Sequence, residues 1–165
     1  MVSKSKILGK PPLILVSIGS TKFPFSRLSS VLKEIDKNRY QIIDKFLPPD
    51  QFIASIKKAD KIIVHGGPGT IFLAFKYAKF MPLIIPRLAK YREHVDDHQL
   101  FFTKYLRSKL PDSLKKYFVT NEKIKDVIGR YLKIKNVPNN LSKYLFINKK
   151  ENKLIKNLDK YLSSI

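Results

Sequence analysis

Short apolar runs alternate with amphipathic stretches along the first two-thirds of the chain. Runs rich in β-branched residues predict buried strands at 13–18, 41–46, 61–64 and 82–86, and a short fifth strand at 117–119. Between these runs, apolar residues at helical spacing predict helices within 25–35, 50–56, 71–79, 97–110 and 124–132. This alternation predicts an α/β fold, a Rossmann-like doubly wound parallel sheet with helices on both faces.

Several helix boundaries have candidate signals. Pro24 suits the first turn of the first helix, and Pro111 ends the helix that begins near Asp97. Asp50 is the expected N-cap of the second helix. Either Thr120 or Asn121 is the expected N-cap of the helix that carries Ile124, Val127, Ile128, Tyr131 and Leu132.

The pattern loosens after residue 133. We therefore expect one folded domain over residues 1–133 and a basic helical extension over 134–165. The end of the extension carries an apolar stripe at helical spacing, formed by Leu154, Ile155, Leu158, Tyr161, Leu162 and Ile165. Such a stripe either packs on the domain or docks on a partner or a membrane surface.

Charge adds a second constraint. The chain has 33 basic and 13 acidic residues in 165, a formal net charge of +20. A field of this sign favours anionic membranes, nucleic acid or a phosphorylated substrate, although lysines that merely solvate the surface would give the same count. There is no block of five or six consecutive basic residues that would form a basic arm.

Other classes of protein are disfavoured by what the sequence lacks. It has no cysteine, so disulfides and thiolate metal sites are excluded. No apolar run approaches the ~20 residues that cross a bilayer, and the N-terminus has no apolar core of signal-peptide length. We expect a cytoplasmic protein.

The candidate chemistry is concentrated between residues 61 and 99. A glycine turn, Gly66, Gly67 and Gly69, leads from the strand ending near His65 into a helix. Unpaired N–H groups and the helix dipole at such a turn suit a phosphate. The loop after the next strand is rich in hydrogen-bonding side chains, and both loops lie at carboxyl ends of strands, where open α/β sheets bind ligands.

Familiar nucleotide and hydrolase motifs are absent. The sequence contains no GxxxxGK[ST], the Gly66–Gly69 turn lacks the GxGxxG spacing, and there is no GxSxG. The chain has three histidines, His65, His94 and His98, which with Asp96 and Asp97 leave a metal site open as an alternative. We expect no metal, because the acidic residues suit another ligand.

Three motifs together resemble a known family. Gly19–Phe25 (GSTKFPF), His65–Thr70 (HGGPGT) and Glu93–Gln99 (EHVDDHQ) are similar to the C-terminal half of family 28 glycosyltransferases of the GT-B type. The resemblance covers about residues 12–130. It is closest to the small donor-binding subunits of two-piece enzymes, which include capsule and exopolysaccharide transferases and the soluble subunit of the dolichol-pathway N-acetylglucosaminyltransferase.

The resemblance implies roles for particular residues. One group would hold the diphosphate of a nucleoside diphosphate sugar, most simply a UDP-sugar, and comprises Gly19, Ser20, Thr21, His65, Gly66, Gly67, Gly69 and Thr70. Lys22 or Arg87 would add positive charge there. A second group would bind the sugar hydroxyls, and comprises Glu93, His94, Asp96, Asp97 and Gln99. His94 and His98 are also weak candidates for a catalytic base. No cofactor is implied.

Two further implications concern the nucleotide. The segment Phe46–Gln51 would lie beside the base. In the family an acidic residue one helical turn after the glycine loop commonly binds the ribose, and the matching position here is Leu73. Ribose recognition is therefore expected to come from another residue or from a partner.

The length of the chain implies a partner. GT-B enzymes carry out transfer between two similar domains, and this chain supplies a single half-domain. The resemblance therefore implies a glycosyltransferase subunit for polysaccharide or lipid-linked oligosaccharide synthesis. It would form a heterodimer with a membrane-anchored, acceptor-binding subunit at the cytoplasmic face of the membrane, and it would transfer the sugar to a lipid-linked acceptor.

Two other hypotheses remain open from the sequence. The first is a basic α/β module that binds nucleic acid or another polyanion, which the net charge favours. The second is a stand-alone hydrolase or phosphotransferase that uses the three histidines.

Overall fold

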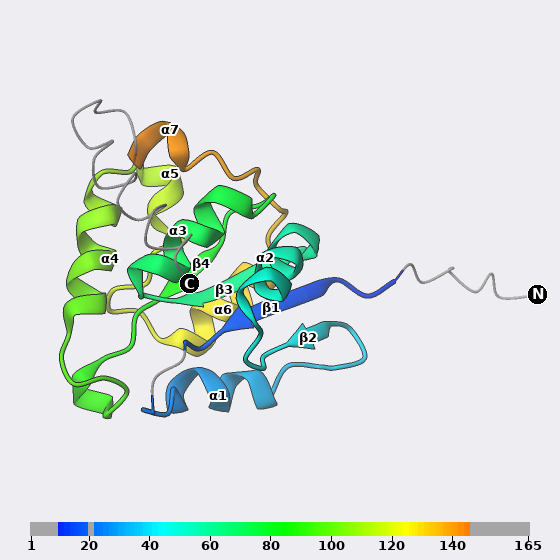
Figure 1. Cartoon of the computed structure of the whole chain (residues 1–165), viewed down its shortest axis with the longest axis horizontal. Helices are drawn as coiled ribbons and strands as arrows, with labels where there is room; N and C mark the ends of the chain where they lie inside the picture. Colours follow the sequence, from blue (N-terminus) through cyan, green and yellow to red (C-terminus); the bar gives the residue numbers. More distant parts are fainter. Residues whose placement is uncertain (1–9, 20–21, 146–165) are drawn as a thin grey trace, which may run out of the picture.

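Four parallel strands form the centre of the molecule in the order β2-β1-β3-β4 (Figure 1). The computed structural model describes residues 10–19 and 22–145. The strands are β1 (Leu13–Ser17), β2 (Gln41–Ile43), β3 (Lys61–His65) and β4 (Leu83–Ile85). All three strand pairs are parallel, and helices flank the sheet, so the predicted α/β, Rossmann-like fold is confirmed.

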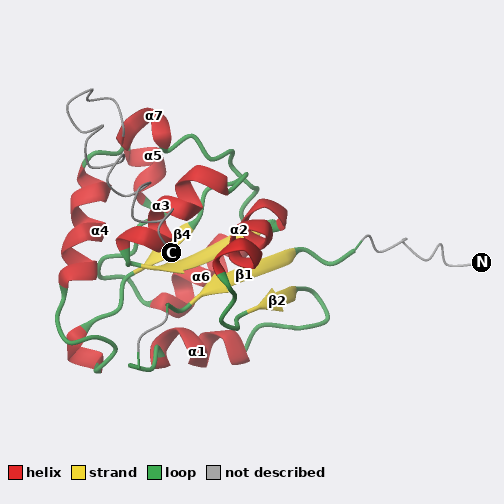
Figure 2. Ribbon diagram, viewed as in Figure 1, coloured by secondary structure: helices red, strands yellow, loops and turns green. Residues whose placement is uncertain are grey.

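Helices cover both faces of this sheet, as Figure 2 shows. In the view of Figure 1, α1 lies below the strands, and α2 and α3 lie above them. Contacts join α1 to α6 and α2 to α3. The helices are α1 (Ser26–Lys33), α2 (Pro49–Lys58), α3 (Pro68–Tyr77), the 3-10 turn η1 (Ala89–Tyr91), α4 (His98–Ser108), α5 (Asp112–Lys115), α6 (Ile124–Lys133) and α7 (Ser142–Leu145).

The strand order reverses between β1 and β3. From β1 the chain moves outward through α1 to β2, then returns past β1 through α2 to β3, and continues through α3 to β4. The loops after β1 and β3 therefore leave the sheet toward opposite faces. A crevice at the carboxyl ends of two such strands is the position where open α/β sheets bind their ligands.

β3 is the most deeply placed strand. All five of its residues are buried, and its neighbours on both sides are strands. A strand covered on both faces must be apolar throughout, which explains the run Ile62, Ile63 and Val64. Lys61 at its start keeps its charge satisfied because its ammonium group donates to the carbonyl oxygens of Tyr131 (2.9 Å) and Ile134 (2.8 Å).

Three predicted strands are at least two residues shorter than expected, and one of them is β4, predicted over 82–86 and observed over Leu83–Ile85. β2 ends at Ile43 rather than near Phe46, because the residues after it turn into an exposed loop. The predicted fifth strand forms a single parallel bridge between Phe118 and Ile84. There the Ile84 N–H donates to the Tyr117 carbonyl and the Val119 N–H donates to Ile84, at 2.8 and 3.0 Å.

The predicted caps were wrong for two helices. α2 begins at Pro49 with Pro48 as its N-cap, so Asp50 lies inside the first turn, where its charge still faces the positive end of the dipole. α6 has Lys123 as its N-cap. The Glu122 carboxylate instead accepts the N–H groups of Thr120 and Asn121, at 2.9 and 3.1 Å.

The chain after residue 133 continues to pack on the same domain. The Met81 N–H donates to the Val137 carbonyl at 2.9 Å, and Leu141 lies fully buried in the core. The Asn139 side-chain amide donates to carbonyl oxygens at the end of α3, those of Ala74, Phe75 and Ala78. Residues 134–141 thus complete the domain. The helix predicted over 154–165 lies outside the described residues.

Over residues 10–19 and 22–145, no helix is both long enough and apolar enough to span a bilayer.

Candidate functional site

Two glycine turns meet at the carboxyl ends of β1 and β3, on either side of the His65 ring. Gly19 follows β1 with φ of +80°, and a Cβ added there would lie 3.0 Å from His65 Nε2. A Cβ added at Gly67 would lie 2.2 Å from His65 Cε1. Both positions therefore need glycine for the imidazole to fit between them.

The hydrogen bonds of His65 fix its tautomer. The Gly67 N–H donates to Nδ1 at 3.0 Å, so Nδ1 is the unprotonated nitrogen. Nε2 therefore carries the hydrogen and donates to Thr70 Oγ1, 3.0 Å away. Burial, and next the nearby positive charge of Arg87, lower the pKa of His65 to about 4. His65 is neutral near pH 7 and acts as a positioning residue.

The orientation of His65 determines what Thr70 offers to a ligand. Because Thr70 Oγ1 accepts a hydrogen bond from the ring, the hydroxyl hydrogen is directed to another acceptor. Thr70 lies in the first turn of α3, behind the N-cap Gly67 and Pro68. The helical hydrogen bonds begin with the Ile71 N–H donating to Gly67 at 3.0 Å.

The first turn of α3 has the properties of an anion site. Backbone N–H groups in the first turn of a helix have no partner within the helix, and the positive end of the dipole lies there. Pro68 provides no N–H, so Gly69 and Thr70 carry the N–H groups of that turn. A Cβ added at Gly69 meets no atom within 4 Å, so no steric contact inside the described structure requires glycine at this position.

Gly66 is different from Gly69. A Cβ at Gly66 would lie 2.9 Å from Gln99 Cβ and 3.0 Å from Pro86. Gly66 is therefore a packing requirement, which lets the start of α4 approach the end of β3.

Arg87 joins the loops that follow β1 and β4. Its guanidinium group donates to the carbonyl oxygens of Ile18 (3.1 Å from Nε), Phe23 (2.6 Å) and Glu93 (2.9 Å). The residue is only 1% exposed. Arg87 is a structural residue that ties these loops together. The expectation that it would face a diphosphate was wrong, because its guanidinium group already donates to backbone carbonyl oxygens.

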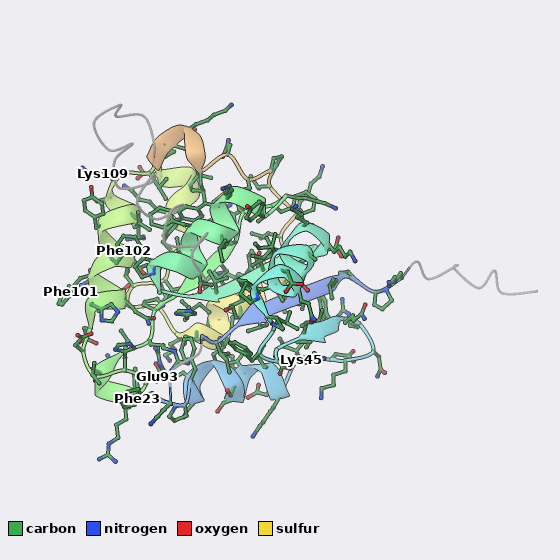
Figure 3. All side chains as sticks on the ribbon, in the orientation of Figure 1. Phe23, Lys45, Glu93, Phe101, Phe102 and Lys109 are labelled. Atoms are coloured by element: carbon green, nitrogen blue, oxygen red, sulfur yellow. The ribbon has the colours of Figure 1, made fainter. Side chains whose placement is uncertain are left out.

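Glu93 is engaged in a similar way. Its carboxylate lies fully buried and pairs with the Arg27 guanidinium at 2.5 Å from Nη2 and 3.0 Å from Nε. It also accepts the N–H groups of Arg27 and Leu88, at 3.3 and 3.2 Å. Figure 3 shows Glu93 at the base of the loop before α4, close to Phe23. Glu93 ties this loop to α1, and we withdraw it from the set of candidate sugar ligands.

Gln99 and Asp97 also support the loop. Gln99 Oε1 accepts the Arg87 N–H at 3.1 Å, and the side chain is buried. Asp97 Oδ1 accepts the Ala89 N–H at 2.8 Å, while the residue remains half-buried. Gln99 is thus a positioning residue, whereas Asp97 is half-buried and uses one of its two carboxylate oxygens in the bond to Ala89.

The remaining candidates, His94, Asp96 and His98, form a cluster at the rim. Asp96 Oδ1 accepts the His98 N–H at 3.1 Å, contacts His98 Nδ1 and lies 3.5 Å from His94 Nδ1. The two imidazole rings are perpendicular with centroids 4.5 Å apart. Hydrogen bonds from His98 hold the pKa of Asp96 below its ordinary value.

A cavity of about 300 Å³ lies beside these turns, between α1 and the end of β2. Ile18, the residue before Gly19, forms one side of it, and Asp44 supplies the only carboxylate among the described residues that line it. Its other lining residues are Ser29, Leu32, Lys33, Lys37, Tyr40 and Ile42. Phe46, two residues after Asp44, is 74% exposed.

Of the sequence candidates, the described residues Gly19, His65, Gly66, Gly67, Gly69 and Thr70 do converge, and Ser20 and Thr21 lie outside the described residues. Leu73 is half-buried within α3. Arg27 could not be predicted from local sequence, because its importance follows only from its long-range pair with Glu93. The structural role of Arg87 likewise has no signal in the sequence. Comparison of the chain with protein-family models, curated proteins and solved structures gives no match.

Proposed function

We propose that this chain binds a nucleoside diphosphate sugar at the carboxyl ends of β1 and β3 and acts as the donor-binding subunit of a glycosyltransferase. The observation that carries the proposal is the meeting of two glycine turns around one neutral histidine, at the point where the strand order reverses. The motifs in the loops after β1, β3 and β4, which resemble family 28 glycosyltransferases, support the same ligand.

The diphosphate is assigned to the first turn of α3. The N–H groups of Gly69 and Thr70 and the Thr70 hydroxyl are the donors that we assign to phosphate oxygens. His65 sets the direction of that hydroxyl without bringing a charge that titrates near pH 7. Fixed donors of this kind stabilise the negative charge that develops on a leaving diphosphate.

The nucleoside is assigned to the loop after β2. Phe46 offers an exposed aromatic face for a base, and Asp44 lines the adjacent cavity. A carboxylate can accept hydrogen bonds from both ribose hydroxyls, which makes Asp44 a substitute for the acidic residue that Leu73 replaces. The second carboxylate oxygen of the half-buried Asp97 is assigned to a sugar hydroxyl.

The acceptor side of the reaction is assigned to a second protein. The described residues form one α/β domain, and the proposed mechanism needs an opposing wall that holds the acceptor and the base. We assign that wall to a membrane-associated subunit that binds a lipid-linked acceptor. The net charge of +20 would favour a position close to anionic lipid.

Calorimetric titration of the full chain tests the donor site. We expect uridine or guanosine diphosphate to bind at least roughly tenfold more tightly than the matching monophosphate, a difference of ~1.4 kcal/mol. Asp44→Asn and Phe46→Ala should weaken binding of the nucleoside diphosphate while leaving inorganic pyrophosphate unaffected. Equal affinity for diphosphate and monophosphate would overturn the assignment.

The alternative is a module that binds nucleic acid or another polyanion, which the net charge supports. Its signature would be affinity for mixed-sequence DNA that falls steeply with salt, together with no response to nucleotide sugars. The same titrations, repeated at two salt concentrations, separate the two functions.

A further inference from the structure

A cluster of three metal-ligating side chains lies at the rim of the site, in the segment that enters α4. His94, Asp96 and His98 each present one ligand atom, and these atoms all lie within 4.8 Å of one another. The three residues occupy every second position of the segment, and the fold brings their side chains together. Two imidazoles and one carboxylate are the ligand types found in catalytic zinc sites with an open coordination position.

His94 provides the observation that points to a missing partner. Its Nδ1 atom is buried and has no hydrogen-bond partner among the described residues. Buried polar atoms without partners are uncommon in folded proteins and call for an explanation. Asp96 Oδ1 lies 3.5 Å from His94 Nδ1. That separation is close to the ~3.3 Å between ligand atoms that zinc–nitrogen bonds of about 2.0–2.1 Å give in a tetrahedron.

The backbone on both sides of the cluster is anchored. Arg92 adopts a left-handed conformation with φ of 56°, which turns the chain just before the cluster. Glu93, adjacent to His94, is held in its buried pair with Arg27. Asp97, between the other two ligands, accepts the Ala89 N–H, and Gln99, directly after His98, accepts the Arg87 N–H. The three ligands are therefore carried on a segment that is fixed at both ends.

The third histidine does not belong to this set. Both nitrogens of His65 are engaged, with Gly67 and with Thr70. The outer side of the cluster is open, because the side chains of Asp96 and His98 are 59% and 49% exposed. A metal held by the three residues would keep at least one position for water or for an oxygen atom of another molecule.

We propose that His94, Asp96 and His98 form a binding site for a divalent transition metal of the zinc type, with the two histidines coordinating through Nδ1. An ion placed there replaces the contact between Asp96 and His98 Nδ1 and gives His94 Nδ1 the partner that it lacks. This site stands on the geometry of the cluster alone and does not depend on the proposed sugar donor.

Nitrogen-15 NMR of the imidazoles tests the site directly. The chain has only three histidines, so all ring signals can be followed in one long-range spectrum. The sample is the full chain without a histidine tag, titrated with zinc chloride at pH 7. We expect the Nδ1 signals of His94 and His98 to shift and saturate at one equivalent of zinc, while the His65 signals stay in place.

Variants supply the control. His98→Gln and Asp96→Asn should each weaken zinc binding roughly tenfold or more, as measured by competition with a chelating indicator dye. Asp126→Asn makes the same chemical change on the exposed side of α6 and should bind as the wild type does. Cobalt in place of zinc should give visible absorption bands of a four-coordinate ion in the wild type. No saturable binding, or binding that neither cluster variant weakens, would overturn the site.

Discussion

The imidazole of His65 donates from Nε2 to Thr70 Oγ1 over 3.0 Å while its Nδ1 accepts the N–H of Gly67. Through this bond a buried, uncharged side chain at the end of β3 sets the direction of a hydroxyl in the first turn of α3. Glycines flank the ring because a Cβ at Gly19 or at Gly67 would lie too close to the imidazole in this position. This relationship makes specific predictions for pH and for substitution.

The free energy of unfolding should fall as the pH is lowered from 6.5 toward 4. In this range His65 is neutral in the folded protein and protonated in the unfolded chain. Because its folded pKa is about 4 and its ordinary value is 6.5, the unfolded chain binds the extra proton in this range. Between pH 7 and pH 5 this linkage removes roughly 2 kcal/mol of folding free energy. Urea denaturation of the wild type and of His65→Gln at pH 7 and pH 5 measures this contribution. If both proteins lose the same folding free energy between the two pH values, the lowered pKa of His65 is contradicted.

Thr70→Val should weaken diphosphate binding and also cost about 1 kcal/mol of stability, because the His65 Nε2–H loses its acceptor. Thr70→Ser keeps the hydroxyl and should preserve most of both properties. Calorimetry and thermal melting of the two variants check this. If Thr70→Val binds as well as Thr70→Ser, the hydroxyl is not a ligand.

Gly69 and Gly129 form a matched pair for testing the loop. Both lie in helices, and a Cβ at either position meets no atom within 4 Å. Valine should therefore have a similar small effect on stability at both sites, whereas only Gly69→Val should obstruct a phosphate at the start of α3. Calorimetric measurement of the diphosphate affinity of the two variants tests this difference. Equal binding by Gly69→Val and Gly129→Val would show that the first turn of α3 is not the contact.

Glu93→Gln should destabilise the fold by about 3 kcal/mol, because the buried Arg27 pair loses its counter-charge. Glu34→Gln is the control, since the Glu34–Lys125 pair is equally close at 2.6 Å but exposed. Surface pairs contribute about 0–1 kcal/mol. Chemical denaturation gives both values, and a loss at Glu93 no larger than at Glu34 would refute the structural role.

Much of the fold follows from local patterns in the sequence. Apolar runs such as Ile62–Val64 specify buried strands because both faces of β3 are covered, and the glycines after His65 mark the turn into α3. The caps were harder to predict. Asp50 is a residue type favoured at the N-cap, but Pro48 is the N-cap of α2, two residues earlier.

The sequence alone could not show which residues of the site are free to bind a ligand and which support its loops. Sequence spacing places Glu93, Asp97 and Gln99 in or next to one loop but cannot distinguish a residue that binds a ligand from one that supports the loop. The distinction depends on Arg27, which pairs with Glu93 across 66 positions of the chain, and on the N–H groups of Arg87 and Ala89, which donate to Gln99 and Asp97. The Glu93 carboxylate is paired with Arg27 inside the protein, whereas the Thr70 hydroxyl accepts a hydrogen bond from His65 and keeps its own hydrogen for another acceptor.

The most direct test of the donor site is a backbone amide titration of the nitrogen-15-labelled chain with a UDP-sugar. We expect saturable shifts centred on Gly19, Gly67, Gly69 and Thr70, smaller shifts after β2 at Lys45 and Phe46, and no shifts on α6. Shifts spread over lysines in proportion to their exposure, or no shifts at a saturating concentration, would contradict this expectation.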